Sequence, residues 1–336
     1  MTAPTGLAYV AYHRLAGRPS VIVDGSPAEG TTLTLTHWPG YPAPAGLARD
    51  LSAQMAFAYL DAGAGLHGPA AAVSNNHFDQ DGLAGLFALA RPEAAQERRA
   101  VLLDLAAAGD FATYTSRAAA RISMVCAAYA DQKRSPLQLA SDEDERCEQL
   151  YSELLARLPE LCDHTGRFRA LWGEEDAALA RSEELIASGR VTIREYPDAD
   201  LAVVDVPEDV SLPGGHRFAH LWYPGLHPMA IANATGRFAV LTRQGHWYRF
   251  HYRYETWVQY CSRRPRARRD LRPLAAALGE LEPAGVTWTA RPSGALEPVL
   301  EPAGGAESRI PPDKLLELVR AHLARSPADW DPYQAG

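Results

Sequence analysis

The segment His77-Phe78-Asp79-Gln80-Asp81-Gly82 places one imidazole and two carboxylates within five residues of the chain. It follows one apolar run, residues 70–73, and precedes another, residues 83–90, so the pattern predicts a strand, a loop and a helix. Side chains in such a loop lie at the C-terminal edge of a sheet, where open α/β folds bind their ligands. Asp79 and Asp81 also repel each other unless a cation, a proton or a strong donor lies between them. We therefore expect a bound charge at this loop.

A donor set in which carboxylates outnumber imidazoles suits Mn²⁺ or Mg²⁺, with Fe²⁺ or Zn²⁺ less suited. Two further acids, Asp104 and Asp110, stand at and just beyond the end of another apolar run, residues 100–103. If that run is a neighbouring parallel strand, its carboxylates converge on the same edge. Two ions held there could activate water for an in-line displacement at phosphorus. The helix that begins near Gly82 would add its positive dipole for an anionic substrate.

Each of these residues also has an ordinary structural use. Asp79 or Asp81 could cap the helix that follows, Asp81-Gly82 could form a turn, and His77 could be a plain loop histidine. The three residues together, between a strand and a helix, favour a metal site over these alternatives.

The second half of the chain offers candidate substrate-binding residues. By the two-residue period of a strand, His251, Arg253 and Glu255 share one face. Arg253 could bind a phosphate or carboxylate through two hydrogen bonds, or this could be a solvated cross-strand face on which Arg253 pairs with Glu255. In the loop that carries His77, Asp79 and Asp81, which we call the metal loop, Asn76 could orient metal-bound water and substrate. Its side chain could instead form hydrogen bonds with the backbone of the loop.

The first part of the chain alternates between predicted strands and helices. Short apolar or β-branched runs predict strands at 19–24, 31–36, 70–74 and 100–103, and apolar spacing predicts helices at 50–60, 83–90 and 116–130. For residues 106–114 the sequence predicts a loop or a short helix. Such alternation implies a parallel or mixed sheet flanked by helices. The sequence thus predicts an α/β metal-site domain over residues 1–140.

Residues 141–190 are charge-rich and predict a helical connector, and the pattern changes after it. Short strand-like runs follow at 191–195, 200–206, 237–242, 246–254 and 286–290, with a last helix at 312–324. These runs predict a smaller α+β domain over residues 191–336 that covers the first and carries substrate-binding residues.

Composition limits the classes of partner. The net charge of −8 over 336 residues argues against general nucleic-acid binding. The arginines between 263 and 272 are typical of a solvated loop, although one or two could reach an anionic substrate. Four cysteines without a CxxC pair indicate a reducing compartment. With neither a signal peptide nor an apolar stretch of ~18 residues, we expect a cytoplasmic protein with no membrane contact. Its partner would be a small anionic molecule, and a homodimer is left open.

The HFDQDG hexapeptide resembles the first motif of the DHH phosphoesterase superfamily, HxDxDG. The resemblance implies that His77, Asp79 and Asp81 coordinate manganese, in a two-domain chain that hydrolyses phosphodiesters or pyrophosphates between its domains. Leu103-Asp104 through Gly109-Asp110-Phe111 is similar to a later aspartate motif of that superfamily. Gly214-Gly215-His216 is similar to its glycine-rich substrate loop, which makes His216 a candidate substrate residue.

The chain departs from the superfamily because the Asp-His-His triplet is absent; the single Asp-His pair, Asp163-His164, is followed by threonine. His37, at the end of the run 31–36, is an alternative imidazole donor, although it precedes the motif. The segments around His37, His77 and Asp110 also resemble a family of bacterial proteins with no assigned activity.

The hypothesis from sequence is a metal-dependent phosphoesterase acting on a small phosphorylated or nucleotide-like substrate. Its two ions would be Mn²⁺, with Mg²⁺ or Fe²⁺ as alternatives, and His77, Asp79, Asp81 and Asp110 would be catalytic. A metal-dependent enzyme of specialised metabolism with a non-phosphate substrate is one alternative. A non-catalytic ligand-binding protein that kept the fold is the other.

Overall fold

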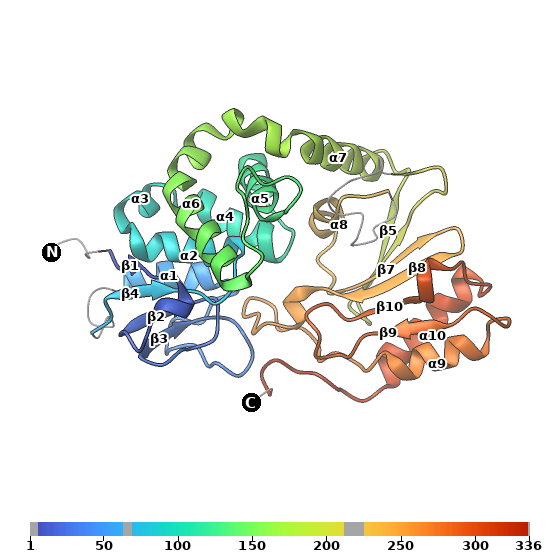
Figure 1. Ribbon diagram of the computed structural model, residues 1–336. Coiled ribbons are helices and arrows are strands. Elements are labelled where there is room, and N and C mark those ends of the chain that lie inside the picture. The colour runs from blue at the N-terminus through green and yellow to red at the C-terminus, as the bar shows by residue number, and fades with distance from the viewer. Residues whose placement is uncertain (1–5, 63–68, 212–224, 335–336) are drawn as a thin grey trace. The chain divides into compact units, whose positions relative to one another are not determined.

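The computed structural model describes residues 6–62, 69–211 and 225–334, and the chain divides into two compact units (Figure 1). Unit 1 comprises Met1–Asp176 together with Tyr260–Ser262, and unit 2 comprises Ala177–Gln259 and Arg263–Gly336. Each unit has its own β-sheet with helices packed against it. The expected α/β fold is therefore confirmed.

The sheet of unit 1 has four strands in the order β1-β4-β2-β3, and every neighbouring pair is parallel. The strands are β1 (Ala8–Tyr9), β2 (Ser20–Val23), β3 (Thr31–Leu35) and β4 (Ala72–Ser74). The central strands β2 and β4 are buried along their whole length, as expected for a parallel sheet. The strands expected at 19–24, 31–36 and 70–74 are confirmed. Because all four run the same way, the segments that follow them leave from one edge.

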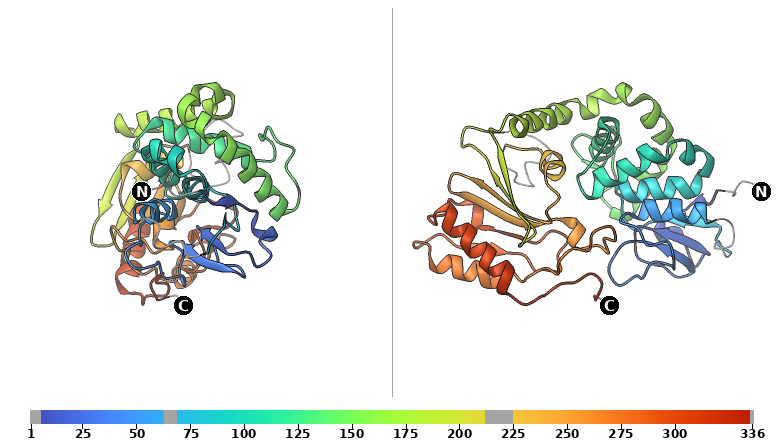
Figure 2. Two further views of the ribbon diagram at one scale, coloured as in Figure 1. Left: turned by 90° about the vertical axis from the view of Figure 1, so that its left-hand side faces the viewer. Right: turned by 180° about the vertical axis from the view of Figure 1, so that it is seen from behind.

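Helices α1 (Ser52–Asp61) and α2 (Gln80–Ala90) lie side by side against one face of this sheet (Figures 1 and 2). A Cβ atom at Gly85 would come within 2.5 Å of Val23 Cγ1, so glycine lets α2 approach β2 closely. Further helices pack outward: α3 (Pro92–Glu97), α4 (Arg99–Asp110) and α5 (Arg117–Ala130). The helices expected at 50–60, 83–90 and 116–130 are confirmed as α1, α2 and α5.

The strand expected at 100–103 is wrong, because these residues lie inside α4. The apolar run of four residues fits a strand or a helix equally. Leu102, Leu105 and Ala106 are all fully buried, and their spacing of three and four residues is the stripe of an amphipathic helix. Asp104 therefore does not follow a strand, and Asp110 is the last residue of a helix.

The segment 141–190 forms α6 (Glu143–His164), a short 3₁₀ turn (Thr165–Phe168) and α7 (Arg169–Ala187). Helix α6 packs on α5 and α2 within unit 1. The division between the units falls inside α7, after Asp176. Among the described residues, no helix combines the length and apolar composition needed to cross a lipid bilayer.

The sheet of unit 2 has six strands in the order β5-β6-β7-β8-β10-β9, and within it only β6 and β7 are parallel neighbours. The strands are β5 (Thr192–Tyr196), β6 (Leu201–Asp205), β7 (Ala239–Gln244), β8 (Trp247–Tyr252), β9 (Trp288–Ala290) and β10 (Val299–Pro302). All five strands expected in this half are present, while β10 was not expected. The strand expected at 246–254 ends at Tyr252.

Three helices complete unit 2: α8 (Pro228–Ala234), α9 (Arg272–Glu280) and α10 (Pro312–Arg325). Helices α9 and α10 bury leucines against one face of the sheet, where Phe250 and Leu300 meet them. Ile231 of α8 packs with Val204 and Val240 on the other face. The last helix was expected; α8 and α9 were not.

The arginine-rich stretch 263–272 is not simply a solvated loop. Arg268 is fully buried and donates to Thr256 Oγ1 at 2.6 Å and to the carbonyl oxygens of Ser293 and Leu296 at 2.7 and 3.0 Å. Burial lowers its pKa to about 9. The other described ion pairs of the stretch join Arg263 to Asp200, Arg264 to Asp331 and Arg272 to Asp270. Arg268 is therefore part of the interior of unit 2, and Arg263, Arg264 and Arg272 form ion pairs on its surface.

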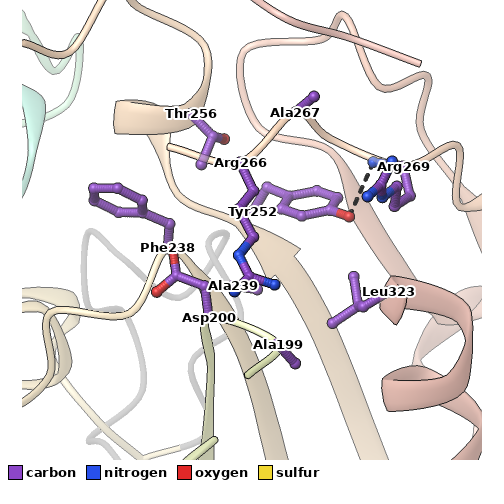
Figure 3. A pocket seen from close by; sticks show the side chains of 10 residues that line it. All are labelled: Ala199, Asp200, Phe238, Ala239, Tyr252, Thr256, Arg266, Ala267, Arg269 and Leu323. Atoms are coloured by element: carbon purple, nitrogen blue, oxygen red, sulfur yellow. Dashed lines mark hydrogen bonds between the residues drawn. The ribbon is translucent and has the colours of Figure 1, made fainter. Parts of the chain in front are cut away.

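A cavity of about 30 Å³ lies beside this stretch (Figure 3). Its lining includes Asp200, Phe238, Tyr252, Arg266, Arg269 and Leu323. The Tyr252 hydroxyl accepts a hydrogen bond from the Arg269 amide at 3.1 Å. The volume is that of roughly one or two water molecules, so the cavity has no room for a substrate.

Candidate metal centre

Six side chains of unit 1 converge at the edge where its parallel strands end. Asp24 directly follows β2, His37 follows β3, three residues follow β4, and one ends α4. They form two groups, each with ligand atoms within 4.8 Å of one another: Asp24, His37, Asp81 and Asp110 form the inner group, and Asp24, His77 and Asp79 form the outer group. Asp24 belongs to both groups because β2 lies between β4 and β3 in the sheet.

Asp24 is held in a specific orientation. Its backbone adopts the left-handed conformation, φ 53°, which residues other than glycine adopt uncommonly and often at functional sites. Oδ1 accepts a hydrogen bond from Ser52 Oγ at 2.8 Å. Oδ2 is buried without a hydrogen-bond donor among the described residues, and it lies 3.6 Å from His77 Nε2. One oxygen of this carboxylate is thus fixed and the other faces the outer group.

His37 presents a lone pair to the inner group. Its Nδ1 lies 2.6 Å from the carbonyl oxygen of Asp50, and a carbonyl only accepts, so Nδ1 carries the proton. Burial lowers the pKa of His37 to about 4, so the ring is neutral at pH 7. The remaining nitrogen, Nε2, lies 3.4 Å from Asp24 Oδ1 and 3.4 Å from Asp110 Oδ2. A lone pair facing two carboxyl groups needs a proton or a cation between them, and this donor set fits a divalent metal.

The outer group contains the exposed part of the centre. His77 Nε2 lies 2.9 Å from Asp79 Oδ2. The side chains of His77 and Asp79 are 31% and 26% exposed, whereas those of Asp24 and His37 are 1% and 0% exposed. Burial works to lower the pKa of His77, but the charge and hydrogen bond of Asp79 outweigh it and raise that pKa. The centre is therefore open at the outer group and closed at the inner group.

The carboxylates of the inner group repel one another. Burial raises the pKa of Asp24 well above its usual value, and the charges of Asp79, Asp81 and Asp110 raise it further. Burial and the charge of Asp79 raise the pKa of Asp81 to about 7, even though two backbone amides stabilise its ionised form. Four acids this close fit a site that is completed by cations.

Two aspartates of the motif also cap helices. Asp79 Oδ1 accepts from the Gly82 amide at 2.7 Å and caps α2. Asp81 caps α1 instead, since its two oxygens accept from the Ser52 and Ala53 amides at 2.7 and 2.8 Å. Both helix N-termini at the centre are therefore occupied by the protein's own carboxylates. The expectation that the helix after Gly82 offers its dipole to an anionic substrate is not supported, because Asp79 takes that position.

The loop after β4 is fixed by a tyrosine from α6. The Tyr151 hydroxyl donates to the carbonyl oxygen of His77 at 2.7 Å and accepts from Asn75 Nδ2 at 3.0 Å. Asn75 Oδ1 accepts from the His77 amide at 3.2 Å. A Cβ at Gly82 would lie 2.3 Å from Asn75 Nδ2 and 2.5 Å from the Tyr151 hydroxyl. Glycine is therefore needed at the end of the motif for packing.

The expected substrate residues take other roles or lie outside the description. Asn76 Oδ1 accepts from the Ser26 amide at 3.3 Å and so supports the loop after β2. Arg253 belongs to unit 2, where it pairs with Glu255 at 2.5 Å and donates to the carbonyl oxygen of Thr235 at 3.0 Å. The finding for Asn76 matches its structural alternative; that for Arg253 matches it in the pairing with Glu255, but the two side chains are only 9% and 4% exposed and form no solvated strand face. His216 lies outside the described residues.

Asp104, an expected ligand, is not in either ligand group. Its two oxygens accept from the Thr115 and Ser116 amides, each at 2.7 Å, just before α5. We expect Asp104→Asn to lower the free energy of unfolding by about 0.5–1.5 kcal/mol, because the amide nitrogen that replaces one carboxylate oxygen cannot accept one of these two hydrogen bonds, and to leave metal content unchanged. Urea unfolding and metal analysis of the purified variant measure the two quantities. A loss of bound metal in this variant would indicate that Asp104 is a metal ligand after all.

Sequence reasoning missed Asp24 as a candidate ligand. The signal was present, since Asp24 ends an apolar strand just as the metal loop follows one. It also missed Ser52 and Tyr151, which hold Asp24 and the metal loop. Their roles depend on contacts across 28 and 74 residues of chain, which local patterns do not show.

Comparison with known sequences gave a single family. The sequence model of a family described as a family of unknown function, DUF6687, matches residues 5–334. No curated protein and no solved structure gives a significant match.

Proposed function

The chain belongs to the DUF6687 family of unknown function, and we propose from the geometry of its centre that it is a metal-dependent hydrolase, a phosphoesterase acting on a small anionic substrate. The observation that carries this proposal is Asp24, whose two oxygens face two adjacent ligand groups. A shared carboxylate of this kind suits a pair of ions. Two ions are the arrangement that stabilises both oxygens of an in-line displacement at phosphorus.

Mn²⁺ is the ion we propose, since oxygen donors outnumber nitrogen donors in both groups. Asp24, His37, Asp81 and Asp110 would hold one ion, and Asp24, His77 and Asp79 the other. When bound, such ions supply Lewis acidity, lower the pKa of water and neutralise charge on the substrate.

The residues of the chain prepare this centre. The Asp50 carbonyl holds the proton of His37 on Nδ1, which keeps Nε2 available as a donor. Ser52 Oγ limits rotation of the Asp24 carboxylate. Asp81 uses one lone pair of each oxygen on α1, which leaves the others for an ion.

Substrate would approach from the exposed outer group, where His77 and Asp79 reach solvent. Asp79 and Asp81 already accept hydrogen bonds from amides at the N-termini of α2 and α1, so we do not expect these helix N-termini to bind an anionic substrate. The ions themselves would therefore bind the anionic group of the substrate. This limits the proposal to substrates whose reacting group is itself an anion, such as a phosphate ester.

Metal binding is expected to release protons. At pH 6 Asp81, with its pKa of about 7, is largely protonated in the metal-free protein, and the raised pKa values of Asp24 and His77 favour their protonated forms, while His37, with its pKa of about 4, carries no extra proton. We therefore expect Mn²⁺ binding to release about 1–3 protons at pH 6, from Asp81, Asp24 and His77, and to strengthen as pH rises to about 7 and above. Calorimetry in buffers of different ionisation enthalpy measures this release. Affinity that is constant from pH 5.5 to 8 would contradict the account.

Turnover on a panel of phosphomonoesters, dinucleotides and pyrophosphate, each with Mn²⁺, tests the proposed activity. We expect phosphate-ester hydrolysis of at least one member, with Asp110→Asn at least ~100-fold slower and Asp104→Asn close to the unchanged chain. If the protein binds Mn²⁺ but hydrolyses no member, the phosphoesterase proposal fails while the metal centre stands.

A further inference from the structure

Three residues from the second half of the chain belong to unit 1. Tyr260–Ser262 cluster with residues before 177, although the chain on either side of them belongs to unit 2. We call these three residues the clasp. They contact the rest of unit 1 at Asp50 and at Phe111. Each of these two residues contacts or adjoins a member of the inner ligand group.

The first position is Asp50, two residues before the start of α1 at Ser52. Asp50 Oδ1 accepts from the Cys261 and Ser262 amides at 2.6 and 2.8 Å. The carbonyl oxygen of the same residue lies 2.6 Å from His37 Nδ1. One residue thus fixes the histidine ring with its backbone and is itself fixed by the clasp through its side chain. If Asp50 moved, His37 would lose the hydrogen bond that sets its tautomer and ring orientation.

The second position is Phe111, immediately after Asp110 in the chain. The rings of Phe111 and Tyr260 meet edge to face, with centroids 5.2 Å apart. The ring of Phe111 also lies 6.3 Å from that of His37. Edge-to-face contacts of this kind favour one relative orientation of the two rings. Tyr260 therefore restrains the residue next to Asp110.

We propose that the clasp and Asp50 position the inner metal group, so that tight binding at Asp24, His37, Asp81 and Asp110 requires Tyr260–Ser262. This inference rests on the proposed metal site. None of the clasp residues is a member of either ligand group, so they act through Asp50 and Phe111. The outer group contains neither His37 nor Asp110, so its affinity does not depend on the clasp in the same way.

The test is a calorimetric Mn²⁺ titration of the full chain and four variants. Asp50→Ala removes the acceptor of both clasp amides, and Asp50→Asn keeps an oxygen in that place. Tyr260→Ala removes the ring next to Phe111. Asp61→Ala is the control: Asp61 also stands on unit 1 near Asp50, where it lines the same surface groove and pairs with Arg99 at 2.7 Å. Far-UV circular dichroism confirms that each variant is folded.

We expect Asp50→Ala and Tyr260→Ala to weaken one of two Mn²⁺ binding events by about 10–100-fold, the usual effect of removing a group that orients a ligand. Asp50→Asn and Asp61→Ala should stay within about threefold of the unchanged chain. Rescue by asparagine would separate positioning from simple loss of charge. If Asp50→Ala does not fold, Tyr260→Ala decides.

Unchanged Mn²⁺ affinity in both Asp50→Ala and Tyr260→Ala would overturn this inference and leave the metal centre intact. Equal weakening of both binding events by Asp61→Ala would also overturn it, because the effect would then not be specific to the clasp. An unchanged chain that takes up no Mn²⁺ would overturn the metal proposal and the inference together.

Discussion

Replacing Asp24 by asparagine should abolish the stabilisation of this protein by Mn²⁺. Asp24 is the ligand common to both groups, so its loss affects both ions. A ligand at 100 times its Kd stabilises the folded state by about 2.7 kcal/mol per site. For a unit of this size, that amount raises the Tm by roughly 5–10 °C for each occupied site. We expect this rise in the unchanged chain and in Asp104→Asn, and none in Asp24→Asn.

Without metal, the same substitution should make the protein more stable. Burial and three neighbouring carboxylates raise the folded-state pKa of Asp24 above its unfolded value. For a carboxyl group with a raised folded-state pKa, stability is greatest at low pH and is lost as pH rises from the unfolded pKa through the folded one. Metal-free Asp24→Asn should therefore be more stable than the metal-free unchanged chain at pH 7, and the difference should shrink towards pH 4.

Differential scanning fluorimetry with and without Mn²⁺ measures both effects. A variant that is less stable than the unchanged chain without metal, yet fully stabilised by Mn²⁺, would show that Asp24 serves the fold and not an ion. General damage to the protein would lower its stability both with and without Mn²⁺. A gain of stability without Mn²⁺ together with a loss of stabilisation by Mn²⁺ therefore indicates a specific effect of Asp24.

Gly82→Ala should damage the fold and the centre together. The new methyl group would meet Asn75 Nδ2 at 2.3 Å, the Tyr151 hydroxyl at 2.5 Å and Asp79 Oδ1 at 3.0 Å. These atoms cannot easily move, since the Tyr151 hydroxyl is bonded to the His77 carbonyl and Asp79 Oδ1 to the Gly82 amide. Overpacking costs about 1–3 kcal/mol, and each broken hydrogen bond adds about 1 kcal/mol.

We therefore expect Gly82→Ala to lower the free energy of unfolding by about 2–4 kcal/mol. It should also weaken Mn²⁺ binding at least tenfold through displacement of His77 and Asp79. Gly173→Ala is the matched control, because Gly173 also lies in a helix and its nearest neighbour to a new Cβ is Arg169 Cγ at 3.4 Å. That control should gain up to ~1 kcal/mol from the better helix former. Urea unfolding of the two variants compares them, and equal behaviour would remove the packing argument.

Strands β2, β3 and β4 of unit 1 could be predicted from sequence because their apolar or β-branched runs are short and bounded by turn residues, whereas β1, a strand of two residues, was not expected. The metal loop could be predicted because His77, Asp79 and Asp81 are contiguous. Residues 100–103 could not be assigned from four apolar side chains alone. Only the spacing of Leu102, Leu105 and Ala106 over a longer window indicates a helix.

The rest of the centre depends on strand order, which local patterns do not encode. Asp24 becomes the shared ligand because β2 pairs with both β4 and β3. His37 was identified as a spare imidazole donor, and the parallel pairing of β3 explains how it reaches the motif. Asp110 reaches the centre from the end of a helix, not from the strand edge that the sequence suggested. The hydrogen bonds from the clasp to Asp50 span 211 and 212 residues of chain.

Anomalous diffraction at the manganese edge, from crystals grown with Mn²⁺, tests the central claim most directly. We expect two peaks, one on either side of the Asp24 carboxylate. One lies among His37, Asp81 and Asp110, the other between His77 and Asp79. Neither peak should appear in crystals of Asp24→Asn. Strong manganese peaks elsewhere with none beside Asp24 in the unchanged chain would contradict the account.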